Sequence, residues 1–216
     1  MSCSSCAFGE TADRHFNAEK VAAEVRRYRQ KGPGITTRKL CDGLASAGLT
    51  QGTVLDIGGG LGGLSVALLD AGMSGATVVD ASAAYLAAAS DEAARGGRST
   101  STQFVHGDFL VVARDLPRAT LVTLDRVVCC YPSYEPLLEQ ALEHAEQALA
   151  MSYPRNRWFV RMGMKWENAM RRRKSNPFRT FVHPPAKMQQ LVEAAGFRLI
   201  SRTNTMMWSA DVFTRN

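Results

Sequence analysis

A glycine-rich turn between two apolar segments, over residues 53–69, restricts the fold of this chain more than any other stretch. It follows TVLDI, a short β-favouring run, and leads into a helix from about Leu61. The turn leaves the backbone open to a ligand, because its residues include Gly58, Gly59, Gly60, Gly62 and Gly63. The helix directs its free N–H groups and positive dipole end at the turn. The stretch therefore predicts a nucleotide-type cofactor site.

Two cofactor classes use such a turn. Gly58, Gly60 and Gly63 spell G-x-G-x-x-G, the dinucleotide fingerprint, which is weak by itself. Asp56 extends the pattern to D-x-G-x-G-x-G, and the stretch then resembles motif I of the class I S-adenosylmethionine-dependent methyltransferases. In that family the acidic group lies near the methionine end of the cofactor, which carries a positive ammonium group. The pyrophosphate of a dinucleotide would instead repel the Asp56 carboxylate. We favour the methyltransferase interpretation; a nicotinamide-dependent oxidoreductase, using NAD or NADP, is the alternative from another enzyme class.

Length and charge limit the remaining possibilities. A chain of 216 residues can bury a full core in one domain. No apolar run approaches the roughly 20 residues of a membrane span, and no secretion signal is visible, so we expect a cytoplasmic protein. The five cysteines do not resemble a secreted disulfide framework. The net charge of +6 is concentrated around residues 26–31 and 171–174 without any nucleic-acid motif, which favours an acidic small molecule over nucleic acid as the partner.

The sequence before the glycine turn divides into a tail and a helical cap. Residues 1–16 are small and polar, and we expect a flexible tail. Cys3 and Cys6 form a single C-x-x-C, which cannot complete a four-ligand zinc site by itself, so we expect an unliganded segment and leave metal or redox chemistry as the alternative. Helical spacing predicts two helices within residues 17–48. In methyltransferases of this class such helices lie over the cofactor and the substrate entrance.

Acidic residues follow the next predicted strands, where α/β sheets bind their ligands. Asp80, followed by Ala81, lies 24 residues after Asp56 and is a candidate acceptor for both ribose hydroxyls. Asp108 and Phe109 resemble motif III, in which an aspartate accepts from the adenine amino group and an apolar neighbour packs on the ring; the alternative is a helix-capping aspartate. Asp125 ends the following strand and is expected to lie at the cofactor, near the methyl group.

The order of these elements resembles the class I fold over nearly the whole chain. We expect an α/β fold, with one Rossmann-like methyltransferase domain over residues 17–216. Its mostly parallel seven-stranded sheet ends in an antiparallel hairpin and has helices on both faces. Helix 135–149 and a strand near 148–153 complete the parallel set. Residues 154–183 form an insertion with a large aromatic and methionine face, which either packs on the sheet or closes as a lid over a flat or greasy substrate.

A narrower resemblance is to the magnesium-protoporphyrin O-methyltransferases. It rests on an N-terminal helix with Arg27 and Tyr28, the segments VLDIGGGLGG and HGDF, a Tyr-Pro pair at Tyr131, and the aromatic insertion. In that family a tyrosine of the N-terminal helix approaches the cofactor, which makes Tyr28 a candidate. The family has a histidine before the Tyr-Pro pair, where this chain has Cys130. The resemblance implies a porphyrin propionate carboxylate as the methyl acceptor.

The donor determines which residues the chemistry needs. The sulfonium is already activated, so the protein mainly aligns the reactants and excludes water. A carboxylate acceptor needs no general base, whereas a hydroxyl needs one and a thiol needs only modest help. The candidate catalytic residues are Tyr28, Arg126, Cys130 and Tyr131, and His183 is more simply structural. A small thiol or sulfide, or a natural-product hydroxyl, is the alternative acceptor, and a cofactor-binding regulator without catalysis is the third possibility.

Overall fold

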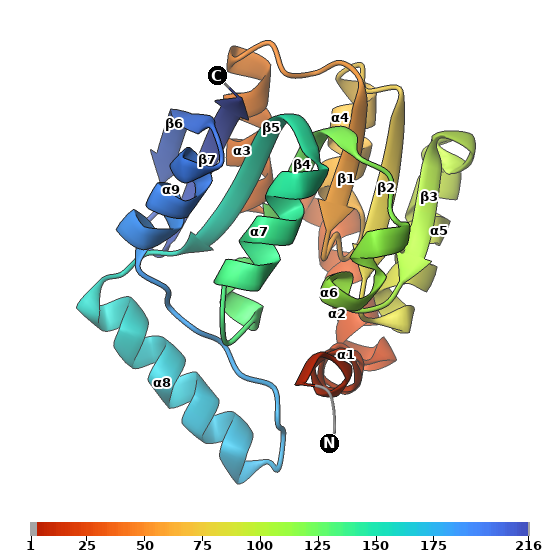
Figure 1. Cartoon of the computed structure of the whole chain (residues 1–216). Coiled ribbons are helices and arrows are strands. Elements are labelled where there is room, and N and C mark those ends of the chain that lie inside the picture. Colours follow the sequence, from red (N-terminus) through yellow and green to blue (C-terminus); the bar gives the residue numbers. More distant parts are fainter. Residues whose placement is uncertain (1–3, 216) are drawn as a thin grey trace.

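A seven-stranded sheet in the order β3-β2-β1-β4-β5-β7-β6 forms the centre of the computed structural model (Figure 1). The structure describes residues 4–215, with side chains from Phe8 onward. Strands β1 to β5 pair in parallel, whereas β7 is antiparallel to both β5 and β6, which confirms the predicted mixed sheet. The strands are β1 Thr53–Ile57, β2 Gly75–Asp80, β3 Thr102–His106, β4 Ala119–Asp125, β5 Ala145–Pro154, β6 Phe197–Asn204 and β7 Trp208–Arg215.

Helices cover both faces of the sheet, as predicted (Figure 1). One face carries α3 Ile35–Ser46, α4 Gly63–Asp70 and α5 Ala83–Arg95; the other carries α6 Phe109–Val112, α7 Glu135–His144 and α9 Pro185–Ala194. Successive side chains of a strand point to opposite faces, so β1 contributes to two cores. Val54 packs in the core beside α3 and α4, whereas Leu55 and Ile57 pack in the core beside α7 and α9. Because β1 is buried on both faces, its sequence is a nearly continuous apolar run rather than an alternation of apolar and polar residues.

The boundary between α7 and β5 differs from the prediction. We expected a helix over residues 135–149, but α7 ends at His144 and β5 begins at Ala145. Ala148 pairs with Leu121 of β4 on one side and with Thr214 of β7 on the other. Pairing with two neighbouring strands therefore overrides the helical preference of this alanine- and leucine-containing segment.

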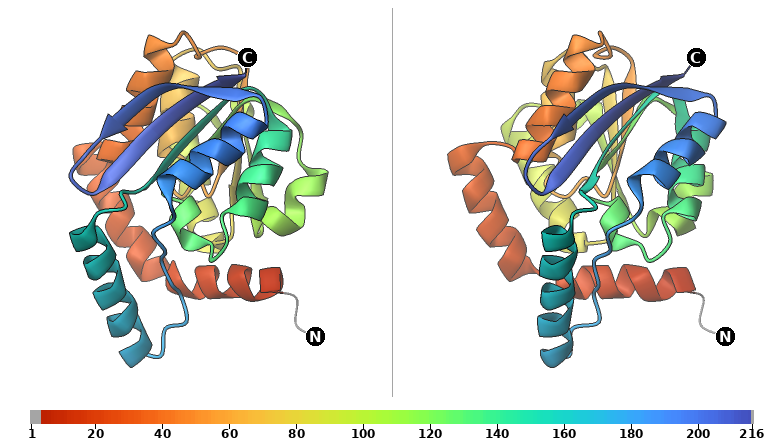
Figure 2. Two further views of the ribbon diagram at one scale, coloured as in Figure 1. Left: turned by 60° about the vertical axis from the view of Figure 1, so that its left-hand side comes forward. Right: turned by 90° about the vertical axis from the view of Figure 1, so that its left-hand side faces the viewer.

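The N-terminal segment is a helix, α1 Ser4–His15, where we expected a flexible tail. It lies across the end of the sheet at which the parallel strands finish (Figures 1 and 2). The Phe8 ring lies 4.2 Å from the Tyr131 ring, and His15 stacks on Phe178 with ring centres 4.2 Å apart. These contacts with residues far along the chain fix a segment whose local sequence gives no helical signal. Cys3 lies outside the described residues and the Cys6 side chain outside the described side chains, so their role stays a prediction.

Two further helices lie at the same end of the sheet. Helix α2 Ala18–Lys31 begins where predicted, because Asn17 caps it by accepting a hydrogen bond from the Lys20 N–H at 3.2 Å. Helix α8 Trp158–Arg173 extends away from the sheet, and residues 174–184 return alongside it (Figures 1 and 2). Among the described helices, none is long and apolar enough to cross a membrane.

Candidate active site

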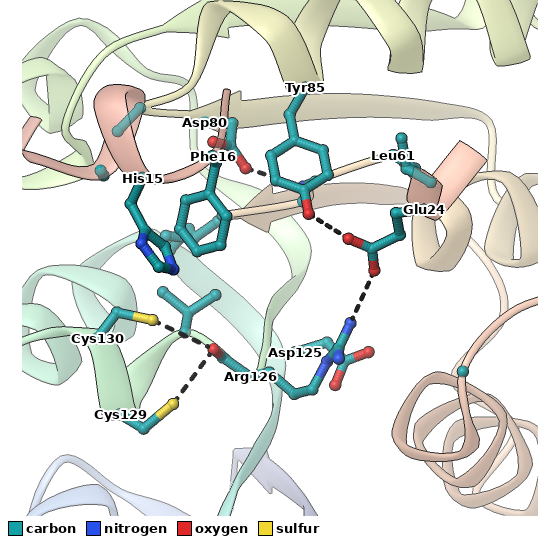
Figure 3. Close-up of a pocket in the computed structure, with 18 of the residues that line it drawn as sticks. His15, Phe16, Glu24, Leu61, Asp80, Tyr85, Asp125, Arg126, Cys129 and Cys130 are labelled. Atoms are coloured by element: carbon teal, nitrogen blue, oxygen red, sulfur yellow. Dashed lines mark hydrogen bonds and ion pairs between the residues drawn. The ribbon is translucent and has the colours of Figure 1, made fainter. Parts of the chain in front are cut away.

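A cavity of about 390 Å³ lies at the carboxyl ends of β1, β2 and β4 (Figure 3). The glycine turn after β1 forms its floor, while residues of α1, α2, α8 and the return segment 174–184 form its walls. This volume lies within the range of small-molecule and cofactor sites. It is lined by all the predicted site residues except Asp108, namely Tyr28, Asp56, Gly58, Gly59, Gly60, Asp80, Ala81, Phe109, Asp125, Arg126, Cys130 and Tyr131. Asp108 lies directly beside it, bonded to Tyr131.

The glycine turn has the backbone that the sequence predicted. Gly58 has a φ of +63°, a left-handed conformation that glycine adopts without strain. A Cβ atom on Gly59 would lie 2.7 Å from Val78 and 2.9 Å from a carboxylate oxygen of Asp56, so no side chain fits there. Helix α4 begins at Gly63, two residues later than expected. The turn therefore exposes backbone to the cavity at the start of a helix.

Asp56 supports this turn from within the protein. It is 1% exposed, and its two oxygens accept hydrogen bonds from the hydroxyls of Thr123 and Ser65, each at 2.7 Å. Burial raises the pKa of Asp56 to about 6. The hydrogen bonds from Ser65 and Thr123 hold the Asp56 carboxylate in place beneath the glycine turn. Asp56 also lines the cavity.

Asp80 connects the end of β2 to the same turn. Its oxygens accept from the backbone N–H groups of Gly60 at 2.9 Å and Ser82 at 2.8 Å. Burial raises the pKa of Asp80 above its usual value. Each carboxylate oxygen has more than one lone pair, so both can still accept a hydrogen bond from a ligand hydroxyl. Ala81 follows, and its carbonyl lies 3.2 Å from a ring nitrogen of His106.

Asp108 has one buried oxygen without a partner. Its Oδ1 accepts from the Tyr131 hydroxyl at 2.6 Å and from the Leu110 N–H at 3.1 Å, so the aspartate also caps α6. Its Oδ2 is buried and accepts no hydrogen bond from the described residues. Buried polar atoms in native proteins normally have a partner. An N–H donor of a ligand, beside the ring of Phe109, would satisfy this oxygen.

The end of β4 brings an arginine with a left-handed backbone next to an acid and a tyrosine. Arg126 has a φ of +64°, which is unusual for a residue with a side chain and is often found at functional sites. Its guanidinium lies 3.6 Å from Glu24 of α2, and Glu24 accepts a hydrogen bond from the Tyr85 hydroxyl (Figure 3). The sequence analysis missed Glu24 and Tyr85, because each resembles an ordinary position of an amphipathic helix.

Asp125 is fully engaged by its neighbours. Its two oxygens accept from the hydroxyls of Thr37 at 2.6 Å and Ser152 at 2.5 Å. Ser152 in turn accepts from the Arg126 N–H at 2.9 Å. These bonds hold the left-handed turn after β4, and Asp125 also lines the cavity.

Three candidate catalytic residues also contact other parts of the protein. Tyr131 donates its hydroxyl to Asp108 and so belongs to that end of the site. The thiols of Cys129 and Cys130 lie 3.4 and 3.6 Å from the carbonyl of Arg126. The neighbouring Cys129 and burial raise the pKa of Cys130 well above its usual value, so this thiol stays protonated at neutral pH. Tyr28 packs over the turn, and its ring would lie 3.0 Å from a Cβ on Gly63.

The outer wall of the cavity is aromatic and cationic. His15 stacks on Phe178, which also contacts Phe16 edge-to-face with ring centres 5.1 Å apart. Burial and the charges of Lys20 and Arg171 lower the pKa of His15 to about 4, so it is neutral at pH 7. His183 lies 3.0 Å from the Tyr131 carbonyl and is structural, as favoured.

Helix α8 contributes to this wall, but not through the predicted aromatic face. Met164, Glu167 and Arg171 line the cavity. Trp158, Met162 and Trp166 are instead 72%, 61% and 68% exposed. These three side chains neither pack on the sheet nor lie over the cavity, so both predicted roles are wrong for them. Within the described residues, no group of three or more His, Cys, Asp or Glu is placed to hold a metal ion.

Comparisons with known proteins fit this geometry. Residues 54–152 match the methyltransferase domain family. No curated protein matches the sequence. Magnesium protoporphyrin IX methyltransferase from Synechocystis PCC 6803, crystallised with bound S-adenosylhomocysteine, superposes with a TM-score of 0.73 at 19% identity, over 94% of this chain and 98% of that one.

Two further solved structures are similar. An O-methyltransferase family protein from Burkholderia thailandensis has a TM-score of 0.69 at 15% identity, over 90% of this chain and 58% of that one. The O-methyltransferase NcsB1 of neocarzinostatin biosynthesis, in complex with S-adenosylmethionine and 2-hydroxy-5-methyl naphthoic acid, has a TM-score of 0.60 at 22% identity, over 92% of this chain and 57% of that one. At these identities the likeness establishes the fold. Residues 54–152 therefore match a methyltransferase domain, and the chain has the fold of these methyltransferases, among them magnesium protoporphyrin IX methyltransferase.

Proposed function

We propose that the protein transfers a methyl group from S-adenosylmethionine to a carboxylate of a planar small molecule. The observation that carries the choice of acceptor is the engagement of every carboxylate that lines the described cavity. Asp56, Asp80 and Asp125 accept hydrogen bonds from protein donors, and Glu24 and Glu167 form ion pairs with arginines. A carboxylate acceptor is ionised at neutral pH and needs none of them as a base.

The cofactor fits the residues at the strand ends. The buried, unpartnered Oδ2 of Asp108 would accept from the adenine amino group, with Phe109 beside the ring. Asp80 and Ala81 would hold the ribose, and the glycine turn with Tyr28 would hold the methionine portion. When bound, S-adenosylmethionine supplies a methyl group that is already activated by its sulfonium. Asp56 and Asp125 keep this end of the site rigid through their four hydroxyl donors.

The outer wall of the cavity suits a flat, acidic acceptor. The rings of Phe8, Phe16 and Phe178 line it, and Arg126 and Arg171 add positive charge. A guanidinium binds a carboxylate with good geometry, so these arginines would orient the acceptor and the aromatic rings would exclude water. Two similar solved structures agree with a flat, acidic acceptor. One is a magnesium protoporphyrin IX methyltransferase, and the other is an O-methyltransferase in complex with a naphthoic acid. A porphyrin propionate is therefore the first acceptor to test.

A small thiol or a natural-product hydroxyl is the second candidate. The observation in its favour is His15, an imidazole in the cavity wall that is neutral at pH 7 and whose ring nitrogens lie within hydrogen-bond distance of Asn176 and Lys20. Its lowered pKa makes it a weak base, which suits a thiol better than a hydroxyl. The methyltransferase domain match argues against a nicotinamide-dependent oxidoreductase.

The proposed function is tested in two steps. Calorimetric titration with S-adenosylmethionine, S-adenosylhomocysteine, NAD and NADP should give saturable binding of the first two alone. Methylation is then assayed on a porphyrin carboxylate, a naphthoic acid, small thiols and phenols, with the product identified by mass spectrometry. A methyl ester is the expected product. Turnover of a thiol with inert carboxylates would overturn the proposed acceptor, and binding without turnover of any compound would indicate a regulator.

Replacing Asp80 with alanine should weaken S-adenosylhomocysteine binding by about 1 to 3 kcal/mol, the loss expected for a charged hydrogen-bond acceptor. Calorimetry on the folded variant measures it. Asp115→Ala is the matched control, because Asp115 is exposed and does not line the cavity. Equal affinity of the two variants would remove Asp80 from the ribose role.

A further inference from the structure

We propose that the outer face of α8 docks on an anionic lipid bilayer. This face carries Trp158, Met162 and Trp166, which recur every four residues and so share one side of the helix. All three are more than 60% exposed, at 72%, 61% and 68%. Scattered apolar side chains are normal at a protein surface, but a row of large ones along one helix indicates an interaction site.

A neighbouring turn extends the same apolar surface. Met206 and Met207, between β6 and β7, are 71% and 44% exposed. The backbone N–H of Arg155 donates to the Met207 carbonyl at 2.8 Å, so this turn lies next to the segment that leads into Trp158. Figure 2 shows the β6–β7 turn beside the start of α8 in both views. We call the five side chains Trp158, Met162, Trp166, Met206 and Met207 the docking face.

Positive charge borders the docking face. Five exposed cations of α8 and its C-terminal end form no ion pair with any described residue; they are Arg161, Lys165, Arg172, Arg173 and Lys174. The one acidic residue of α8, Glu167, is already paired with Arg171. A helix with tryptophan on one side and lysine and arginine beside it is typical of segments that lie in the membrane interface.

The charge pattern selects among the possible occupants. A second copy of the chain would bring two sets of these cations together, and like charges across an interface disfavour association. Anionic lipid headgroups instead match the cations, while the tryptophan and methionine side chains enter the boundary between headgroups and acyl chains. The long arginine and lysine side chains can bury their methylene groups and keep their charges in the headgroup layer.

The opposite side of α8 lines the cavity through Met164, Glu167 and Arg171. Docking would therefore hold the cavity next to the bilayer surface. This surface proposal does not depend on the identity of the methyl acceptor, because it concerns the side of α8 that faces away from the site.

Vesicle co-sedimentation of the full chain tests the proposal. The protein should pellet with vesicles of phosphatidylcholine and phosphatidylglycerol, stay in the supernatant with phosphatidylcholine alone, and be released by high salt. Trp158→Ser combined with Met162→Ser and Trp166→Ser should weaken binding about tenfold or more. Ile35→Ser with Val111→Ser is the matched control, because both side chains are 51% exposed and lie outside the docking face.

Removal of charge gives a second, independent readout. Each of Arg161→Gln and Lys165→Gln should weaken binding about fivefold, since a cation near an anionic surface contributes about 1 kcal/mol. Arg114→Gln and Arg118→Gln, exposed elsewhere, should have no such effect. Two of the three tryptophans lie on the docking face, so emission should also shift to the blue on anionic vesicles.

Circular dichroism of each variant checks that it is folded before binding is measured. Three results would overturn the proposal. They are a wild-type protein that ignores anionic vesicles, equal binding by the serine variant and its control, and a dimer in sedimentation velocity that the same serine substitutions dissociate. The last result would assign the docking face to a second copy of the chain. Because none of these readouts involves cofactor or turnover, their failure is distinct from failure of the proposed function.

Discussion

Gly58→Ala is expected to lower the free energy of unfolding by about 2 to 5 kcal/mol and to abolish cofactor binding. Two separate costs contribute. A left-handed backbone at φ +63° costs a residue with a Cβ about 1 to 2 kcal/mol. The new Cβ would also lie 2.5 Å from a methyl group of Val127, and such overpacking typically costs about 1 to 3 kcal/mol. Relief of the clash would move the glycine turn, so S-adenosylhomocysteine binding is lost with stability.

Gly97→Ala separates the two costs. Gly97 has a φ of +69°, but a Cβ there would have no heavy atom within 4 Å, so only the backbone cost remains. Chemical denaturation of both variants measures the difference, and calorimetry should find normal cofactor affinity for Gly97→Ala. Equal loss of stability in the two variants would show that the contact with Val127 is unimportant.

Arg202→Met is expected to lower the free energy of unfolding by about 3 to 5 kcal/mol, because it leaves a buried charge without its partner. Asp211 is fully buried on β7, and its oxygens accept from the Arg202 guanidinium at 2.8 and 2.6 Å. The Tyr153 hydroxyl donates to the same carboxylate at 2.7 Å but carries no charge. The ion pair raises the pKa of Arg202 further.

Two controls accompany this measurement by urea denaturation. Arg98→Met removes one partner of an exposed pair with Asp70, and should cost less than about 1 kcal/mol. The double variant of Arg202→Met with Asp211→Asn should recover part of the loss, because the buried charge is gone. If Arg202→Met lowered the free energy of unfolding as little as Arg98→Met does, water would have to reach Asp211 and solvate its charge.

The parallel strands were predictable because the signals for them are local. Apolar runs with an acidic residue at or next to their last position, at Asp56, Asp80 and Asp125, each form a parallel strand. The same feature located the floor of the cavity, since parallel strands end at one edge. By contrast, the helical character of residues 4–15 comes from distant contacts such as that of Phe8 with Tyr131, which no local pattern reveals.

The sequence was less informative about which way side chains point. The periodicity of α8 correctly indicated an amphipathic helix. Periodicity does not say whether the apolar side packs on the rest of the protein or is exposed at the surface. Likewise, Glu24 resembles a solvated helix position until the fold brings it to Arg126 and Tyr85. Tyr131 was a candidate catalytic residue, and only the structure shows that its hydroxyl donates to Asp108. Orientation depends on tertiary packing, which spacing alone does not determine.

Helix α1 lines the cavity and is attached to loops and helix ends of the protein. It is held by ring contacts of Phe8 with Tyr131 and of His15 with Phe178. The Ala83 N–H also donates to the Asp13 carboxylate at 2.9 Å, and the Asn176 amide lies 2.9 Å from a ring nitrogen of His15. None of these contacts involves a strand of the sheet. Segments of this kind open at a small fraction of the free energy of global unfolding. Exchange of bound molecules can thus proceed by detachment of one helix, at a rate that the stability of the sheet does not limit.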